Sequence, residues 1–91
     1  MPAIVVSKVM RPQRRDIYVT VMDDYAAEMH LTLPVTMSKT DRDAKIKSAL
    51  QTMNEGQAAM EAQAKIEGMD ISALKSTGTL KRDAATKKGQ K

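Results

Sequence analysis

The stretch EMHLTLPVTM at residues 28–37 decides the fold, because apolar and polar residues alternate along it without a break. From position 29 to position 37 every odd residue is apolar, and the residues between them are His, Thr or Pro. This period of two is typical of a β-strand with one buried face and one solvated face. Pro34 has no amide hydrogen to donate to a neighbouring strand, so the sequence predicts an edge strand.

Two earlier segments predict the rest of a sheet. Residues 16–22 alternate in the same way, whereas residues 3–10 carry apolar side chains on both faces, which is typical of a central or covered strand. The connections at 11–15 and 23–26 are short and have the composition of turns. We therefore predict a three-stranded antiparallel β-meander with strands near 3–10, 16–22 and 28–37.

The period changes to that of a helix after residue 37. Ser38 with Asp41, or Thr40 with Asp43, has the spacing of a helix N-cap followed by an acid. An apolar stripe at helical spacing comes next, formed by Ile46, Ala49, Leu50 and Met53. The core shared by the strands and the helix is predicted to contain Val19, Val21, Leu31, Leu33, Ile46 and Leu50.

The helical region covers about 40–74 and fits either one helix or two. Gly56 can separate two helices, or it can lie inside one, because Gly in a helix costs only about 1 kcal/mol relative to Ala. Gly68 is a predicted stop, and Asp70 is a predicted cap for a further short turn. Residues 1–74 are therefore predicted to form one small α+β body.

Charge is distributed unevenly along the 91 residues, whose net charge is +4. Residues 1–15 carry +4, residues 16–74 carry −5 and residues 75–91 carry +5. The last segment is rich in Lys, Ser, Thr and Gly and holds too little apolar surface to order itself. We therefore predict an extended basic tail at 75–91 that is ordered by lying on another subunit. Such a tail fits an anionic partner, which is either a protein surface or nucleic acid.

Nine residues are candidates for contact with a partner. Arg guanidinium groups bind carboxylates and phosphates through two hydrogen bonds, so the arginines of the first turn and the basic residues of the tail are candidates. The two large apolar residues near the tail are candidate anchors. The candidate contact residues are Arg11, Arg14, Arg15, Leu74, Leu80, Lys81, Arg82, Lys87 and Lys88.

Composition argues against several other classes of protein. There is no Cys and only one His, so the sequence offers no disulfide, no thiolate nucleophile and no cluster of metal ligands from these residues. Its four Gly are scattered, and no phosphate-binding loop or nucleophile elbow is present. We expect no catalytic residue, cofactor or metal, and thus a protein that is not an enzyme. No apolar stretch approaches the roughly 20 residues of a membrane span, so we expect no membrane contact and a cytoplasmic location unless the protein belongs to a virion.

The overall style of the chain resembles that of small bacteriophage structural proteins. The resemblance is carried by the start Met1-Pro2-Ala3-Ile4-Val5-Val6, the small meander, the capped helix rich in Ala, Gln and Met, and the Lys-rich end. It implies a non-enzymatic assembly subunit in a virion, in a neck, tail or capsid-decoration position. Its partners would be other protein subunits, as a homo-oligomer or docked on a larger assembly. The alternative is a small basic-tailed accessory protein associated with nucleic acid.

Overall fold

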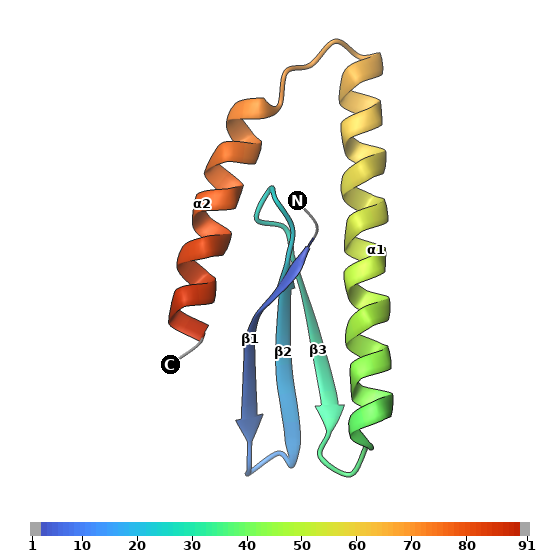
Figure 1. Cartoon of the computed structure of the whole chain (residues 1–91), viewed down its shortest axis with the longest axis vertical. Helices are drawn as coiled ribbons and strands as arrows, with labels where there is room; N and C mark the ends of the chain where they lie inside the picture. The colour runs from blue at the N-terminus through green and yellow to red at the C-terminus, as the bar shows by residue number, and fades with distance from the viewer. Residues whose placement is uncertain (1–2, 90–91) are drawn as a thin grey trace.

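The described part of the chain forms a three-stranded antiparallel sheet followed by two helices, so the predicted α+β meander is confirmed (Figure 1). The computed structural model describes residues 3–89, and side chains as far as residue 86. Its elements are β1 (Ile4–Arg11), β2 (Asp16–Met22), β3 (Glu28–Pro34), α1 (Lys39–Ile66) and α2 (Ser72–Gly89). In the sheet β2 lies between β1 and β3. Helix α1 contacts β2 and β3, whereas α2 contacts β1.

The alternation of β2 sets the core. Val19 and Val21 are fully buried, and in the ladder Val19 lies opposite Lys8 of β1 and Leu31 of β3. Strand β1 is an edge strand, and its pairing with β2 shifts at a bulge between Val5 and Ser7. A bulge lets neighbouring side chains escape strict alternation, and α2 contacts this same strand. The apolar residues on both faces of β1 therefore mark a covered edge strand rather than a central one.

Helix α1 is a single helix of 28 residues, which decides between the two predicted alternatives. The Ser38 Oγ accepts a hydrogen bond from the Asp41 amide at 3.1 Å, so the helix begins at the first of the two predicted caps. Gly56 lies inside the helix, and Gly68, with a φ of 68°, follows its end as predicted. Of the predicted core, four residues are buried and two are half-buried against them: Val19, Val21, Leu33 and Ile46, then Leu31 and Leu50.

Two boundaries differ from the prediction. Strand β3 ends at Pro34, three residues early, because the Met37 amide donates to the Pro34 carbonyl in the turn that leads into α1. The extended tail expected from residue 75 is wrong for its described part, since α2 runs from Ser72 to Gly89. The Asp70 Oδ1 accepts from the Ser72 amide at 3.0 Å and so caps α2 at its start. Ala, Lys and Arg, all good helix formers, then fill much of the segment 80–89.

Helix α1 is much longer than the sheet on which it packs. Its 28 residues span about 42 Å at 1.5 Å per residue. Strands of seven or eight residues span only about 23–27 Å. The last turns of α1 and the connection to α2 therefore extend past the strands, and the longest dimension of the molecule is 47 Å (Figure 1). We call residues 66–70, at the end of this overhang, the tip.

Truncation of Leu33 tests the register of the sheet. Leu33 is 4% exposed and lies in the central cluster, so Leu33→Ala should lower the free energy of unfolding by about 2–5 kcal/mol. The matched control Leu80→Ala removes a side chain that is 73% exposed, and should change it by less than about 0.5 kcal/mol. Urea denaturation followed by circular dichroism measures both. Equal effects of the two variants would contradict the register.

Candidate functional site

A buried carboxylate joins three parts of the chain. Asp24 lies in the turn between β2 and β3, and its side chain is 1% exposed. Arg82 of α2, also 1% exposed, donates from Nη1 to the Asp24 Oδ1. Gln57 of α1 donates from Nε2 to the Asp24 Oδ2 at 3.0 Å and accepts from the Asp24 amide at 3.1 Å. The turn and both helices therefore meet at Asp24, and we call this group of three residues the latch.

Gly78 brings α2 close enough for the latch to form. It lies one turn before Arg82, against the backbone of Asp24 and Tyr25. A Cβ atom at position 78 would overlap the Asp24 carbonyl oxygen and the Tyr25 backbone. Only a residue without a side chain permits this approach. Gly78 is thus a packing requirement of the helix.

Further polar contacts surround the latch. The Tyr25 hydroxyl donates to the Glu61 Oε2 at 2.8 Å, and the Lys75 Nζ donates to the same oxygen at 3.2 Å. Burial first, and then the bond to Glu61, raise the pKa of Tyr25 to about 12. The bond from Tyr25, followed by that from Lys75, lowers the pKa of Glu61. Both shifts show that the phenol stays protonated while the carboxylate stays charged.

Polar groups, rather than apolar side chains, hold α2 in place. Up to residue 86, the buried residues of α2 are Gly78 and Arg82, while Leu74 and Leu80 are 63% and 73% exposed. Burial alone would raise the pKa of Asp24, but hydrogen bonds, including that from Gln57, and the charge of Arg82 lower it below its usual value. A buried ion pair owes much of its strength to such additional hydrogen bonds.

The arginines predicted as contacts at the first turn are not one cluster. Arg11 binds Asp16 through two hydrogen bonds of 2.7 and 2.8 Å and lies 4.6 Å above the Tyr18 ring. Arg14 and Arg15 are exposed, and Arg15 has a φ of 54° in the turn. Arg11 therefore belongs to the sheet surface, and two arginines remain at the turn for a partner.

The candidates of the tail are also divided by the structure. Arg82 is buried in the latch, so it is not available to an external partner. Lys81 and Leu74 line a groove between the helices, whereas Leu80 lies beside a shallow depression elsewhere on α2. The side chains of Lys87 and Lys88 lie outside the described residues.

Sequence reasoning missed the latch because Asp24 was expected to be a turn residue and Arg82 was expected to contact an external partner. Adjacent acids at 23 and 24 were expected to be turn residues, and Asp23 does accept from the amides of Tyr25 and Ala27. Asp24 instead turns inward. The signal that could have revealed this is Gly78 four residues before Arg82, since that spacing places both on one helical face.

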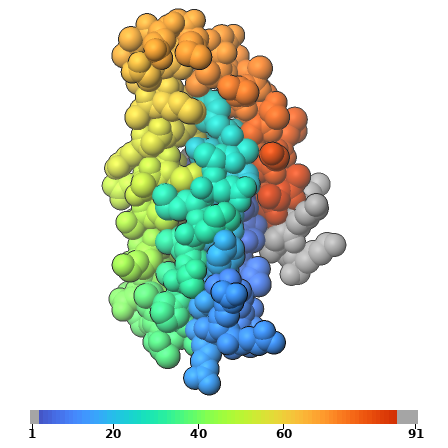
Figure 2. All heavy atoms as spheres, turned by 180° about the vertical axis from the view of Figure 1, so that it is seen from behind, coloured from blue at the N-terminus to red at the C-terminus, as the bar shows by residue number. Residues whose placement is uncertain are grey.

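Apolar side chains are exposed along the overhang of the helices. Ile66 is 79% exposed and Met69 is 60% exposed, both at the tip. Separately, a groove of about 240 Å³ between the two helices is lined by Tyr25, Ala26, Met60, Ile71, Leu74, Thr77, Gly78 and Lys81. Seen from behind, the tip stands clear of the strands (Figure 2). We call Met60, Ile66, Met69, Ile71 and Leu74 together the apolar surface.

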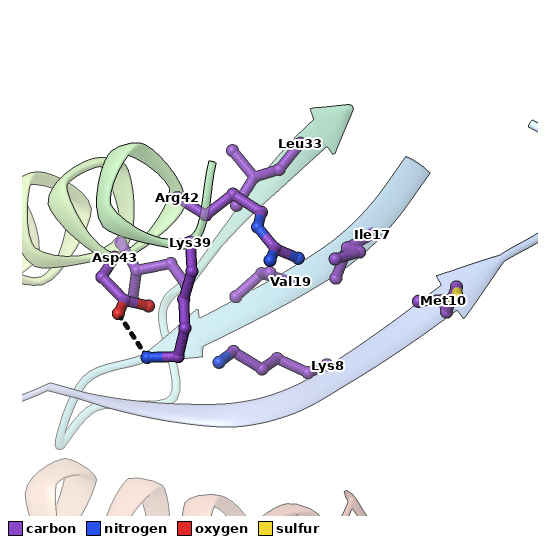
Figure 3. A pocket seen from close by; sticks show the side chains of 9 residues that line it. Lys8, Met10, Ile17, Val19, Leu33, Lys39, Arg42 and Asp43 are labelled. Carbon is purple, nitrogen blue, oxygen red and sulfur yellow. Dashed lines mark hydrogen bonds and ion pairs between the residues drawn. The ribbon is translucent and has the colours of Figure 1, made fainter. Parts of the chain in front are cut away.

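A second hollow lies at the opposite end of the molecule, between the start of α1 and the sheet (Figure 3). Its volume is about 320 Å³, and its floor is formed by Met10, Ile17, Val19, Leu33 and Ile46. Its rim carries Lys8, Lys39, Arg42 and Asp43. Lys39 and Asp43 form an ion pair of 2.9 Å, and the buried Arg42 Nε has no hydrogen-bond partner among the described residues. We call this hollow the basic pocket.

The close packing of Gly78 against the turn can be tested by a substitution that adds a single methyl group. Gly78→Ala should release α2 from the sheet, because the added Cβ overlaps backbone atoms. Gly56→Ala is the matched control, since a Cβ at Gly56 has no neighbour within 4 Å and improves helix propensity. Hydrogen exchange measured by NMR should show loss of protection in α2 but not in α1 or β2. Full α2 protection in Gly78→Ala would contradict the packing.

The latch also predicts a dependence on pH. Because the folded protein lowers the pKa of Asp24, its contribution to stability is complete above the unfolded value of about 3.9 and is lost as pH falls through the lowered value. Urea denaturation between pH 7 and pH 2 measures this. Asp24→Asn should lose less free energy of unfolding between pH 7 and pH 2 than the unaltered chain loses. Asp43→Asn should lose about as much as the unaltered chain, because Asp43 and its partner Lys39 are both exposed. Equal profiles for the two variants would show that Asp24 is not the group that titrates.

Comparisons of the chain with protein-family models, with curated proteins and with solved structures found no match. Within residues 3–89, neither helix is long and apolar enough to cross a membrane. The same residues contain no group of three or more His, Cys, Asp or Glu side chains placed to hold a metal ion. The apolar surface and the basic pocket are therefore the features from which a function can be inferred.

Proposed function

We propose that this chain is a non-enzymatic protein-binding subunit that assembles with other copies of itself or with other subunits of a larger complex. The observation that carries the proposal is the apolar surface, which lies on an overhang where no strand covers it. Several large apolar side chains exposed near one end of a molecule, with charged residues among them, are typical of a protein-binding site. Exposed Glu67 and Asp70 adjoin Ile66 and Met69 in sequence, and Lys81 lines the groove together with Met60 and Leu74.

The magnitude of the apolar contribution favours a multivalent assembly over a tight isolated dimer. Full burial of Ile66, Met69 and Leu74 would contribute roughly 1.5–3 kcal/mol for each side chain. Association costs an estimated 4–15 kcal/mol in lost translational and rotational freedom. One such contact is therefore weak, and several contacts per subunit make an assembly stable.

Thr20 and His30 form the arrangement closest to a hydroxyl–imidazole catalytic pair, but their surroundings do not suit catalysis. The Thr20 Oγ1 lies 3.1 Å from the His30 Nδ1, but Thr20 is only 8% exposed. His30 stacks on the Tyr18 ring with 5.3 Å between centroids. Neither Thr20 nor His30 lines the basic pocket, the groove between the helices or the depression beside Leu80. A buried hydroxyl beneath a stacked imidazole is a packing arrangement of the sheet face, and we assign it that role.

The resemblance to small bacteriophage structural proteins supports placing this subunit in a virion, at a neck, tail or capsid-decoration position. The nucleic-acid alternative has less support, because Arg11 and Arg82 are both held in intramolecular ion pairs. Of the candidate basic residues with described side chains, Arg14, Arg15 and Lys81 remain exposed. Two of them lie in the β1–β2 turn and the third lies on α2, so they do not form one phosphate-binding stripe.

Sedimentation of the full chain tests the proposal. The average mass should rise with protein concentration, and Met69→Lys should weaken self-association at least tenfold because it places a charge on the apolar surface. Val9→Lys is the matched control, since Val9 is 51% exposed but lies on β1. A chain that stays monomeric at every concentration contradicts self-assembly. If that monomer binds DNA with an affinity that falls steeply as salt is added, the nucleic-acid alternative replaces the proposal.

A further inference from the structure

We propose that copies of this chain associate head to tail, with the tip of one copy seated in the basic pocket of the next. This inference rests on the proposed function, whose partner and contact surface it specifies. The tip carries acidic residues and the pocket carries basic ones, and both surfaces have an apolar centre. They also lie at opposite ends of the long axis, so one copy cannot bring its own two surfaces together (Figure 1).

The basic pocket is suited to an apolar side chain that carries an acid beside it. Ile17, Val19 and Leu33 of the floor are the inner face of the sheet at the end where α1 begins. The volume of about 320 Å³ lies at the lower end of the range of about 300–1,000 Å³ found for ligand pockets. Met10, on the floor, is 61% exposed, so apolar surface there is open to an incoming group.

The rim of the pocket has a net positive charge. Lys39 is paired with Asp43, and the remaining rim residues Lys8 and Arg42 are both basic. In the close view the Arg42 guanidinium extends from α1 over the strands (Figure 3). Its Nε is buried and lacks a hydrogen-bond acceptor among the described residues. An incoming carboxylate would supply that acceptor, and a buried donor without a partner is costly.

The tip has the complementary composition. Ile66 and Met69 are exposed at 79% and 60%, and the carboxylates of Glu67 and Asp70 stand next to them on the surface. Interactions with Ser72, first from its hydroxyl and then from its amide, lower the pKa of Asp70, so this carboxylate is charged at neutral pH. Lys65 is the single base adjoining the tip in sequence. An apolar anchor inserted in a pocket with charges at its border is the usual arrangement of an interface hot spot.

The geometry makes this a heterologous contact, in which one surface binds a different surface on the next copy. Such a contact generates a ring if the rotation closes and an open filament if it does not. Each copy would use one tip and one pocket, which gives every internal subunit two contacts. In a closed ring the last contact forms within one assembly, so the ring gains the stability that a single weak contact lacks.

Two variants, studied alone and mixed, test the inference by sedimentation. Ile66→Lys places a cation on the tip, and Lys8→Glu places an acid on the rim of the pocket. Each variant alone should associate at least tenfold more weakly than the unaltered chain. An equimolar mixture should associate more strongly than either variant alone at the same total concentration, because the intact tip of the Lys8→Glu copy can enter the intact pocket of the Ile66→Lys copy.

Matched controls and folding checks keep the outcomes distinct. Lys47→Glu makes the same charge change on an exposed part of α1, and Val9→Lys makes the same change as the tip variant on β1. Both should associate normally, and circular dichroism should show that all four variants fold. If the unaltered chain associates but the mixture stays monomeric, or if either test variant associates normally, the head-to-tail contact is overturned while the proposed function stands. If the unaltered chain itself is monomeric, self-assembly fails and the head-to-tail contact fails with it.

Discussion

The ion pair between Asp24 and Arg82 is the interaction on which the arrangement of the two helices depends. Helix α1 can pack on the sheet through Ile46, Ala49 and Met53, but α2 has no comparable apolar face. Its position is set by one buried charge pair and by the missing side chain at Gly78. Removing one partner of a buried pair commonly costs about 3–5 kcal/mol, because the other charge stays in the interior. The groove between the helices is lined partly by α2, so its shape depends on where this pair holds the helix.

The sheet and the first helix were predictable because their signals are local and periodic. The alternation at 28–37 and the stripe at Ile46 and Ala49 each repeat at the period of one element, so neighbouring residues support the same reading. The helix caps at Ser38 and Asp70 were predictable because their signals are also local in sequence. Agreement between local preference and tertiary packing is typical of natural sequences.

The second helix and the candidate site were not predictable in the same way. The basic composition after residue 75 predicted an extended tail lying on another subunit, yet Arg82 is buried in its own chain because a carboxylate 58 positions earlier neutralises it. Single-sequence patterns carry no information on such a pairing between distant residues. The basic pocket is similar, since Lys8 and Arg42 come from β1 and α1 and meet only in the folded chain. The exposure of Ile66 and Met69 was not predictable either, because it depends on how far α1 extends past the sheet.

The bond between Tyr25 and Glu61 has a practical consequence for spectroscopy. The chain contains no Trp and only two Tyr, so its near-ultraviolet absorption and intrinsic fluorescence come from Tyr18 and Tyr25. Tyr18 lies on the sheet under Arg11, whereas Tyr25 lies between the two helices and touches the backbone at Gly78. One of the two natural chromophores therefore reports on the sheet and the other on the seating of α2. Opening of the second helix can be followed optically in the unlabelled protein.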